Sequence, residues 1–185
     1  SRGLGDVYKR QPWWYDKDKQ SPVEAILDEA ARYDMKVFMS TGWAKDQDDN
    51  LQDPAVKQRQ LQIMEELAVF YKNHKAFYGW YLPVEDCLCP IFAEHAVQSV
   101  NALTQKANAL TPGKKTLISP YGIGLSDFDN PEYEKQLAKL KVDIIAYQDE
   151  VGCVRNKFML PRLKKTWQRL RDIHNRLNIE MWANC

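Results

Sequence analysis

The chain has 185 residues, which is enough for one domain with a sizeable buried core. Its 26 basic and 25 acidic residues nearly balance, so the charge does not indicate a nucleic acid or an anionic membrane surface as a partner. The sequence contains no run of about 18 apolar residues, which excludes a membrane-spanning helix. Composition therefore favours an ordinary globular domain.

The two ends of the chain differ from those of a typical domain. Residues 6–11 resemble the translation of a transposase end sequence used in preparing sequencing libraries. Residues 1–11 are therefore interpreted as an artefact and excluded from the fold prediction. The chain stops at Cys185, directly after a strand-like segment. We expect residues 12–185 to be a fragment of one larger domain.

Hydrophobic periodicity predicts helices and strands in strict alternation from residue 21 onward. Apolar residues spaced three and four apart indicate amphipathic helices, and short β-branched or aromatic runs indicate strands. In chain order, the predicted elements are a helix over 22–33, a strand over 35–41, a helix over 53–71, a strand over 77–82, a helix over 91–110, a strand over 116–119, a short helix over 130–140, a strand over 143–147, a helix over 156–177 and a strand over 179–183.

Several of the predicted helices carry start and stop signals. Ser21, Asp53 and Asn130 each precede a proline, the pattern of an N-cap followed by proline in the first turn. Ser21 with Glu24 is read as a capping box. The segment 111–113, Thr-Pro-Gly, is expected to end the third helix.

The repeat of about 30 to 40 residues is the size of a βα unit, and strict alternation indicates a parallel sheet covered by helices. The two choices are a barrel and an open doubly wound sheet. No Gly-rich fingerprint follows a predicted strand, which disfavours dinucleotide binding in an open sheet. We predict an α/β fold: a partial (β/α)8 TIM barrel with about five of the eight βα units, truncated at both ends.

Functional side chains of a βα barrel gather at the C-terminal ends of its strands. Glu85 lies just beyond the aromatic-rich strand over 77–82, where a carboxylate can serve as a general acid or base. Aromatic rings, amides and carboxylates recur at the other predicted strand ends, as in a ligand pocket. These positions are Trp13, Trp14, Tyr15, Gly42, Trp43, Glu85, Asp86, Pro120, Tyr121, Gln148, Asp149, Glu150, Trp182, Asn184 and Cys185.

Structural explanations compete with functional ones at these positions. Glu85 can equally be a salt-bridged structural carboxylate, and Asp149 can simply solvate a loop. Trp80 and Trp167 are expected in the core. A basic cluster on the last helix is interpreted as a solvated outer face rather than a nucleic-acid site; it consists of Arg162, Lys164, Lys165, Arg169 and Arg171.

The four cysteines do not form a CxxC pair. Cys87 and Cys89, together with Cys153, could meet at one rim of the barrel, but zinc sites usually show tighter and more complete ligand spacing. We predict ordinary free thiols, no metal site and no cofactor.

Five parts of the chain carry a resemblance to a known family. They are residues 35–38 with 41–43; 77–83 with Glu85; 118–121; 143–146 with 148–149 and 151–152; and 182–184. Read together, residues 12–185 resemble a bacterial TIM-barrel family catalogued as domain of unknown function 4434. That family is similar to the glycoside hydrolases of the large retaining clan.

The resemblance implies a secreted or periplasmic, carbohydrate-active protein. In the retaining clan, a Glu that ends the fourth barrel strand is the acid/base and usually follows an Asn. Glu85 matches this position, whereas Val84 replaces the Asn. The nucleophile of the clan ends the seventh strand, which implies a position just past Cys185. Asp149 is the substitute within the chain.

The leading hypothesis is a glycoside hydrolase that acts on a polysaccharide or glycan. The resemblance implies a retaining mechanism, which is the pattern of the clan. Glu85 and Asp149 are the candidate catalytic residues. The candidate substrate-binding residues are Trp43, Tyr121 and Trp182, which would stack on sugars, and Gln148 and Asn184, which would bind hydroxyls.

The alternative is a non-catalytic carbohydrate-binding barrel, which is favoured by Val84 standing in place of the Asn. A metal-dependent lyase or aldolase is a weaker third hypothesis, because no buried Lys or His/Asp/Glu cluster stands at the predicted strand ends. The sequence does not indicate an oligomeric state.

Overall fold

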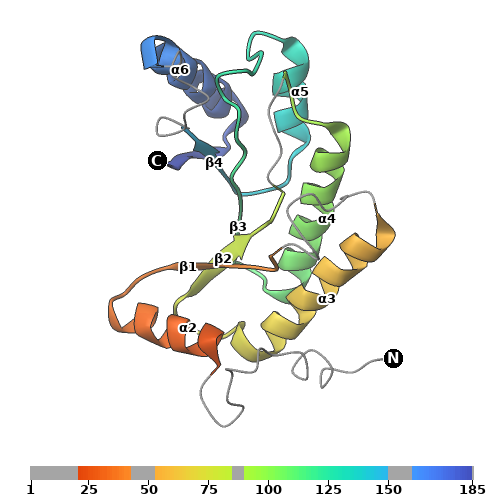
Figure 1. Ribbon diagram of the computed structural model, residues 1–185, viewed down its shortest axis with the longest axis vertical. Coiled ribbons are helices and arrows are strands. Elements are labelled where there is room, and N and C mark those ends of the chain that lie inside the picture. Colours follow the sequence, from red (N-terminus) through yellow and green to blue (C-terminus); the bar gives the residue numbers. More distant parts are fainter. Residues whose placement is uncertain (1–20, 43–52, 85–89, 150–159, 185) are drawn as a thin grey trace.

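The computed structural model describes residues 21–42, 53–84, 90–149 and 160–184. In these residues, helices and strands alternate as predicted. Figure 1 shows that the βα units succeed one another along the long axis of the molecule, from α2 and β1 at one end to α6 and β5 at the other. The segments 43–52 and 85–89, which contain the predicted site residues Trp43 and Glu85, lie outside the described residues.

All the described strands belong to one parallel sheet in sequential order. Its strands are β1 (Val37–Ser40), β2 (Phe77–Tyr81), β3 (Lys115–Ile118), β4 (Ile144–Gln148) and β5 (Glu180–Asn184). A doubly wound sheet reverses its strand order at a switch point, whereas a barrel adds each new strand beside the last. The order β1-β2-β3-β4-β5 therefore confirms the partial TIM barrel rather than the open sheet.

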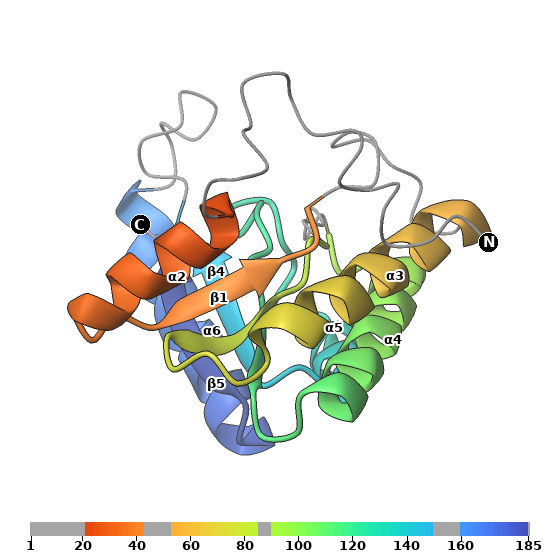
Figure 2. The same cartoon turned by 90° about the horizontal axis from the view of Figure 1, so that it is seen from below.

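The helices are α2 (Pro22–Arg32), α3 (Pro54–Tyr71), α4 (Glu94–Leu110), α5 (Pro131–Lys139) and α6 (Leu160–Leu177). Figure 2 shows the same units turned by 90°. None of the described helices combines the length and apolar character that crossing a bilayer requires. Of the predicted helix over 156–177, residues 156–159 lie outside the described part of the chain.

The cap signals succeed at two helices and fail at one. Asp53 Oδ1 accepts a hydrogen bond from the Ala55 backbone N–H at 2.8 Å, and Asn130 Oδ1 accepts one from Glu132 at 3.0 Å. The capping box at Ser21 was a wrong prediction, because its side chain makes no cap hydrogen bond. The Ser21 hydroxyl instead accepts from the Tyr71 hydroxyl at 3.1 Å, which ties the start of α2 to the end of α3.

The N-cap of α3 gives a testable prediction. Asp53→Ala should lower the free energy of unfolding by about 1 kcal/mol, because the bond to the Ala55 N–H is lost and the helix dipole loses its negative partner. Urea denaturation followed by circular dichroism measures this. Gln58→Ala, at an exposed position of the same helix, is the control and should change stability by less than about 0.5 kcal/mol. Equal effects of the two changes would contradict the capping role.

The core has one layer on each face of the sheet. The larger layer packs helix residues against outward-facing strand residues, and Trp80, which is 1% exposed, lies in it as predicted. Its indole Nε1 donates to the Thr111 hydroxyl at 2.8 Å, at the point where α4 ends. The smaller layer consists of strand residues alone: Leu117, Ile144 and Ala146, with Phe38 and Tyr81 against them. The helices thus cover one face, and the other is the inner face of the barrel wall.

Gly79 on β2 makes room for an aromatic ring on that inner face. A Cβ added here would collide with the backbone carbonyl oxygen of Lys115 and lie 2.8 Å from Phe38 Cε1. The ladder between β1 and β2 also shifts register between Val37 and Phe38. Because Gly79 has no side chain, the Phe38 ring can lie against β2 and border a pocket on the inner face.

Candidate functional site

The inner face of the sheet holds a pocket of about 390 Å³. Side chains alternate along a strand, so positions two apart share a face. The inner-face side chains that lie nearest the C-terminal ends of the strands surround this pocket. Its lining residues are Phe38, Ser40, Tyr81, Leu117, Ser119, Ala146, Trp182, Ala183 and Asn184. This end of the strands is where barrel enzymes place their active sites.

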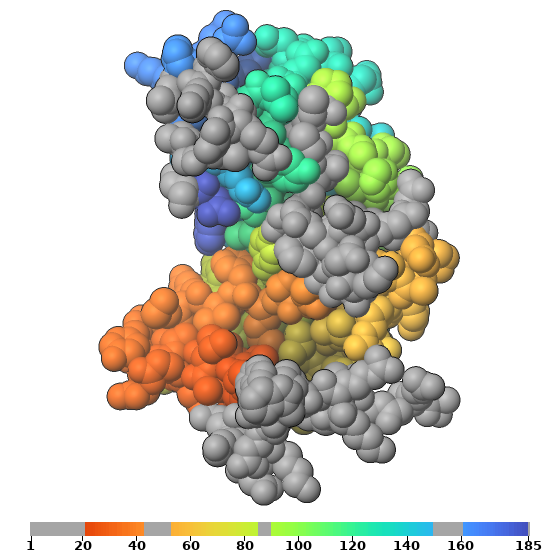
Figure 3. Space-filling view, in the orientation of Figure 1, coloured from red at the N-terminus to blue at the C-terminus, as the bar shows by residue number. Residues whose placement is uncertain are grey.

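One wall of the pocket is aromatic. The Phe38 and Trp182 rings meet edge to face at 5.8 Å between centroids, with an interplanar angle of 87°. Trp182 is 37% exposed, and Figure 3 shows the dark blue atoms of β5 at the molecular surface. Glu180 Oε1 accepts the indole N–H of Trp182 at 2.8 Å, which restrains the ring. Trp182 therefore offers mainly aromatic surface to a ligand.

Ser119 organises the polar side of the pocket. Its carbonyl oxygen accepts from Gln148 Nε2 at 2.9 Å, and its hydroxyl oxygen accepts from Asn184 Nδ2 at 3.1 Å. The Asp149 backbone N–H donates to the Asn184 carbonyl at 3.1 Å. These bonds join the C-terminal ends of β3, β4 and β5. Because a backbone carbonyl can only accept, the orientation of the Gln148 amide is fixed, and its Oε1 remains an acceptor.

The predicted site residues have different positions relative to this pocket. Trp182 and Asn184 line it, and Gln148 reaches it through Ser119. Asp149 is half-buried and follows Gln148 directly, at the edge of the site. Tyr121 is half-buried in the loop after β3 and does not line the pocket. Trp43 and Glu85 lie outside the described residues.

Sequence reasoning missed Ser119, Phe38, Ser40 and Tyr81 as lining residues. Their signal was the period-two alternation inside each predicted strand, which places Phe38 and Ser40 on one face of β1. The structure adds that Ser40 Oγ accepts the Gly42 N–H at 3.1 Å, while Gly42 adopts a φ of 62°. This turn directly follows the end of β1.

The described part of the pocket lining carries little charge. Of the lining residues that the structure describes, only Tyr81 has an ionisable side chain. Within the described ranges, no group of three or more His, Cys, Asp or Glu side chains is placed to hold a metal ion. Cys87, Cys89 and Cys153, the three cysteines that could form a metal site, all lie outside those ranges. The described lining residues thus offer a ligand mainly aromatic, hydroxyl and amide groups.

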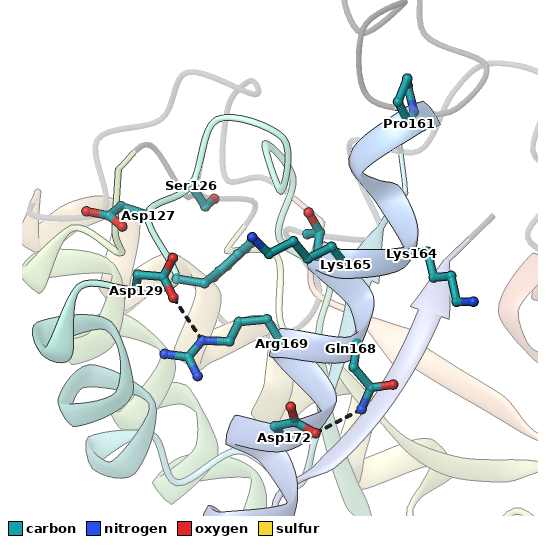
Figure 4. A pocket seen from close by; sticks show the side chains of 11 residues that line it. Ser126, Asp127, Asp129, Pro161, Lys164, Lys165, Gln168, Arg169 and Asp172 are labelled. Carbon is teal, nitrogen blue, oxygen red and sulfur yellow. Dashed lines mark hydrogen bonds and ion pairs between the residues drawn. The ribbon is translucent and has the colours of Figure 1, made fainter.

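A larger pocket, of about 700 Å³, lies away from the inner face, between α6 and the loop that precedes α5. Figure 4 shows Arg169 reaching across to Asp129, whose ion pair measures 3.1 Å, and Gln168 bonded to Asp172 at 2.9 Å. Lys164, Lys165 and Arg169 are exposed, as expected of a solvated helix face. The three cations are matched by Asp127, Asp129 and Asp172, so the charges of the described lining residues balance.

Comparison with solved structures supports the βα-barrel fold. The chain is similar to a complex of the intracellular xylanase TsXylA from Thermoanaerobacterium saccharolyticum with xylotriose, with a TM-score of 0.51, 14% identity and coverage of 90% of this chain and 58% of that one. It is also similar to GH10 from Paenibacillus barcinonensis, with a TM-score of 0.52, 14% identity and coverage of 90% and 56%. The chain thus spans less than two thirds of these proteins, and such low identity shows the fold alone.

A search of curated protein sequences finds no significant match. A family match, in contrast, covers residues 3–185, which is nearly the whole chain. The chain therefore belongs to the family described as "Domain of unknown function (DUF4434)".

Proposed function

We propose that this chain is part of a glycoside hydrolase that acts on a neutral polysaccharide or glycan. The observation that carries the proposal is the pocket at the C-terminal ends of the strands, where Trp182 and Phe38 face a hydroxyl and amide cluster around Ser119. Aromatic faces pack on the apolar faces of sugar rings, while amides and hydroxyls bind sugar hydroxyl groups. Among the described residues that line the pocket, Tyr81 is the only one with an ionisable side chain, which favours an uncharged sugar in this part of the site.

The proposed chemistry uses two carboxylates. Glu85 comes four residues after the end of β2 and would be the general acid that protonates the leaving group. Asp149 follows β4, two strands away in the sheet, which corresponds to roughly 10 Å between strand axes. An inverting mechanism requires the two carboxyl groups to be about 6.5–9.5 Å apart, which leaves room for a water molecule. The retaining mechanism implied by the family resemblance would instead need a second carboxylate about 5 Å from Glu85.

The neighbours support the substrate class. TsXylA is a xylanase whose structure was solved in complex with xylotriose, a neutral oligosaccharide. Such a ligand suits the aromatic, hydroxyl and amide groups among the described lining residues. We therefore propose neutral oligosaccharides, xylo-oligosaccharides among them, as the first ligands to test.

One observation favours the second candidate, a non-catalytic carbohydrate-binding barrel. Val84 stands directly before Glu85, where the retaining clan usually has a sugar-binding Asn. Val84 is only 2% exposed and belongs to the core between the sheet and the helices. It therefore offers the substrate no polar group, and the binding barrel needs no such contact.

The test is titration of the chain with neutral oligosaccharides, followed by calorimetry or NMR. Trp182→Ala should weaken binding about tenfold, or roughly 1.4 kcal/mol, because the stacking surface is removed. The matched control is Tyr33→Ala, which removes an aromatic residue that is 68% exposed just after α2, and it should leave affinity unchanged. Equal affinities of wild type and Trp182→Ala would overturn the assignment of this pocket, as would the absence of any oligosaccharide binding.

A further inference from the structure

A buried hydrogen-bonded chain runs along the helix-facing side of β4. The hydroxyls of Tyr133 on α5 and Tyr147 on β4 lie 2.9 Å apart. The Tyr147 hydroxyl also lies 2.8 Å from His174 Nε2 on α6, and His174 Nδ1 lies 3.1 Å from the Ile179 carbonyl oxygen. All three side chains are at most 2% exposed. This polar chain joins two helices to the strand that ends in Gln148.

The direction of every bond in the chain follows from the Ile179 carbonyl. A carbonyl oxygen can only accept, so His174 Nδ1 must carry the hydrogen that it receives. In neutral histidine the other nitrogen, Nε2, is then an acceptor, and the Tyr147 hydroxyl donates to it. The oxygen of Tyr147 is thereby available to accept from the Tyr133 hydroxyl. While His174 is neutral, the side-chain hydrogens of His174, Tyr147 and Tyr133 each have an acceptor.

Burial favours this neutral state. Desolvation lowers the pKa of His174, although its bond to the Ile179 carbonyl partly offsets the effect. Desolvation likewise raises the pKa of Tyr147 and that of Tyr133 well above the ordinary range. Near neutral pH all three groups are therefore uncharged.

Protonation of His174 would reverse the chain. Both ring nitrogens would then donate, so Tyr147 would have to accept from Nε2 and turn its own hydrogen towards Tyr133. The Tyr133 hydrogen would lose its acceptor, since Tyr147 is the hydroxyl's only hydrogen-bond partner in the described part of the chain. A buried donor without a partner is costly, so β4 and the two helices would separate to admit water.

Charged groups on the neighbouring elements also face His174. A polar pocket of about 500 Å³ beside the ring is lined by Lys115 of β3, Asp143 before β4 and Glu180 of β5. Lys115 and Asp143 form an ion pair at 3.7 Å, so their opposite charges largely cancel in their electrostatic effect on His174. Glu180, which also holds the Trp182 indole, would attract a protonated His174. On the helix side, Glu134 of α5 is paired with Arg176 of α6 at 2.6 Å.

We propose that His174 is a positioning residue for the inner-face pocket, and that mildly acidic pH switches this positioning off. In the neutral form it holds Tyr147 and, through the strand, the adjacent Gln148 and Asp149 at the end of β4. Gln148 in turn donates to Ser119, so a shift of β4 would disturb the amide cluster of the pocket. The role in ligand binding rests on the proposed function, whereas the coupling of His174 to Gln148 does not.

The experiment compares pH profiles of the full chain between about pH 7.5 and 5, with three readouts. These are the free energy of unfolding, the NMR signals of the Gln148 side-chain amide and the Trp182 indole, and the affinity for a neutral oligosaccharide. His174→Gln is the test variant, because glutamine offers an acceptor and a donor but does not titrate. His95→Gln, on α4 and outside the polar chain, is the matched control.

In the wild type, stability should fall as pH drops below about 6.5, since the unfolded chain takes up the proton before the folded one. The Gln148 amide signals should shift, and affinity should fall by up to about tenfold per pH unit once folded His174 titrates. His174→Gln should remove these dependences, and His95→Gln should keep them.

Two results would overturn the proposal. The first is identical pH profiles of the wild type and His174→Gln. The second is a wild-type loss of stability at low pH while the Gln148 NMR signals do not move, which would indicate a structural role only. If no oligosaccharide binds at any pH, the proposed function fails, and the Gln148 signals still decide whether His174 positions this strand end.

Discussion

Glu85→Gln is expected to lower the hydrolysis of a glycan substrate by about 10²- to 10⁴-fold while leaving affinity within about twofold. Glutamine has nearly the same shape as glutamic acid, but its amide cannot donate a proton to the leaving group. The loss should therefore fall on turnover rather than on binding. Release of reducing ends measures the first quantity, and calorimetry with the same oligosaccharide measures the second.

Glu29→Gln is the control, because this exposed carboxylate pairs with Arg32 on the surface of α2. It should change neither quantity. Unchanged turnover in Glu85→Gln would remove Glu85 from the mechanism. Binding without turnover, in the wild type and in both variants, would favour the carbohydrate-binding barrel that the burial of Val84 suits.

The largest expected effect on stability is at Trp80. Trp80→Ala should lower the free energy of unfolding by about 3–5 kcal/mol, because the indole is 1% exposed and its removal leaves a cavity between β2 and the helices. The change also removes the edge-to-face contact with Phe77 at 5.0 Å and the hydrogen bond to Thr111 at 2.8 Å. Urea denaturation at neutral pH measures the loss.

The matched control is Trp182→Ala, which deletes the same side chain from the inner face, where it is 37% exposed. It should cost less than about half as much, because partly exposed atoms lose less burial. The two tryptophans thus separate the parts of the protein: Trp80 stabilises the fold, and Trp182 serves the proposed ligand site. Equal losses at both positions would contradict this division.

Local sequence signals determined the elements of this protein. The apolar stripes predicted α2 and α3, and Pro22 and Pro54 marked their first residues. Asp53 caps α3 by accepting a hydrogen bond from the Ala55 backbone N–H. These features depend on residues within one turn of each other, so the order of the sequence is sufficient to predict them. Strict alternation predicted a parallel sheet covered by helices, and the absence of a Gly-rich fingerprint favoured the barrel over an open sheet, which the strand order then confirmed.

The failure at Ser21 shows where local reasoning stops. Its sequence context was that of a capping residue, yet Tyr71, 50 positions later, donates to the hydroxyl that was expected to cap α2. A long-range partner competed with the local one, and nothing near Ser21 in the sequence records it.

The sequence by itself thus determined the elements, their alternation and the residue types at the strand ends, including Trp182 and Asn184. Only the tertiary structure decided which of them meet. Ser119 became the centre of the pocket because the register of three parallel strands brings Gln148 and Asn184 to it, across 29 and 65 positions of sequence. The polar chain through His174 likewise needs two helices and a strand packed at hydrogen-bonding distance. Such contacts depend on strand register and helix packing, which are set by the whole core rather than by any local pattern.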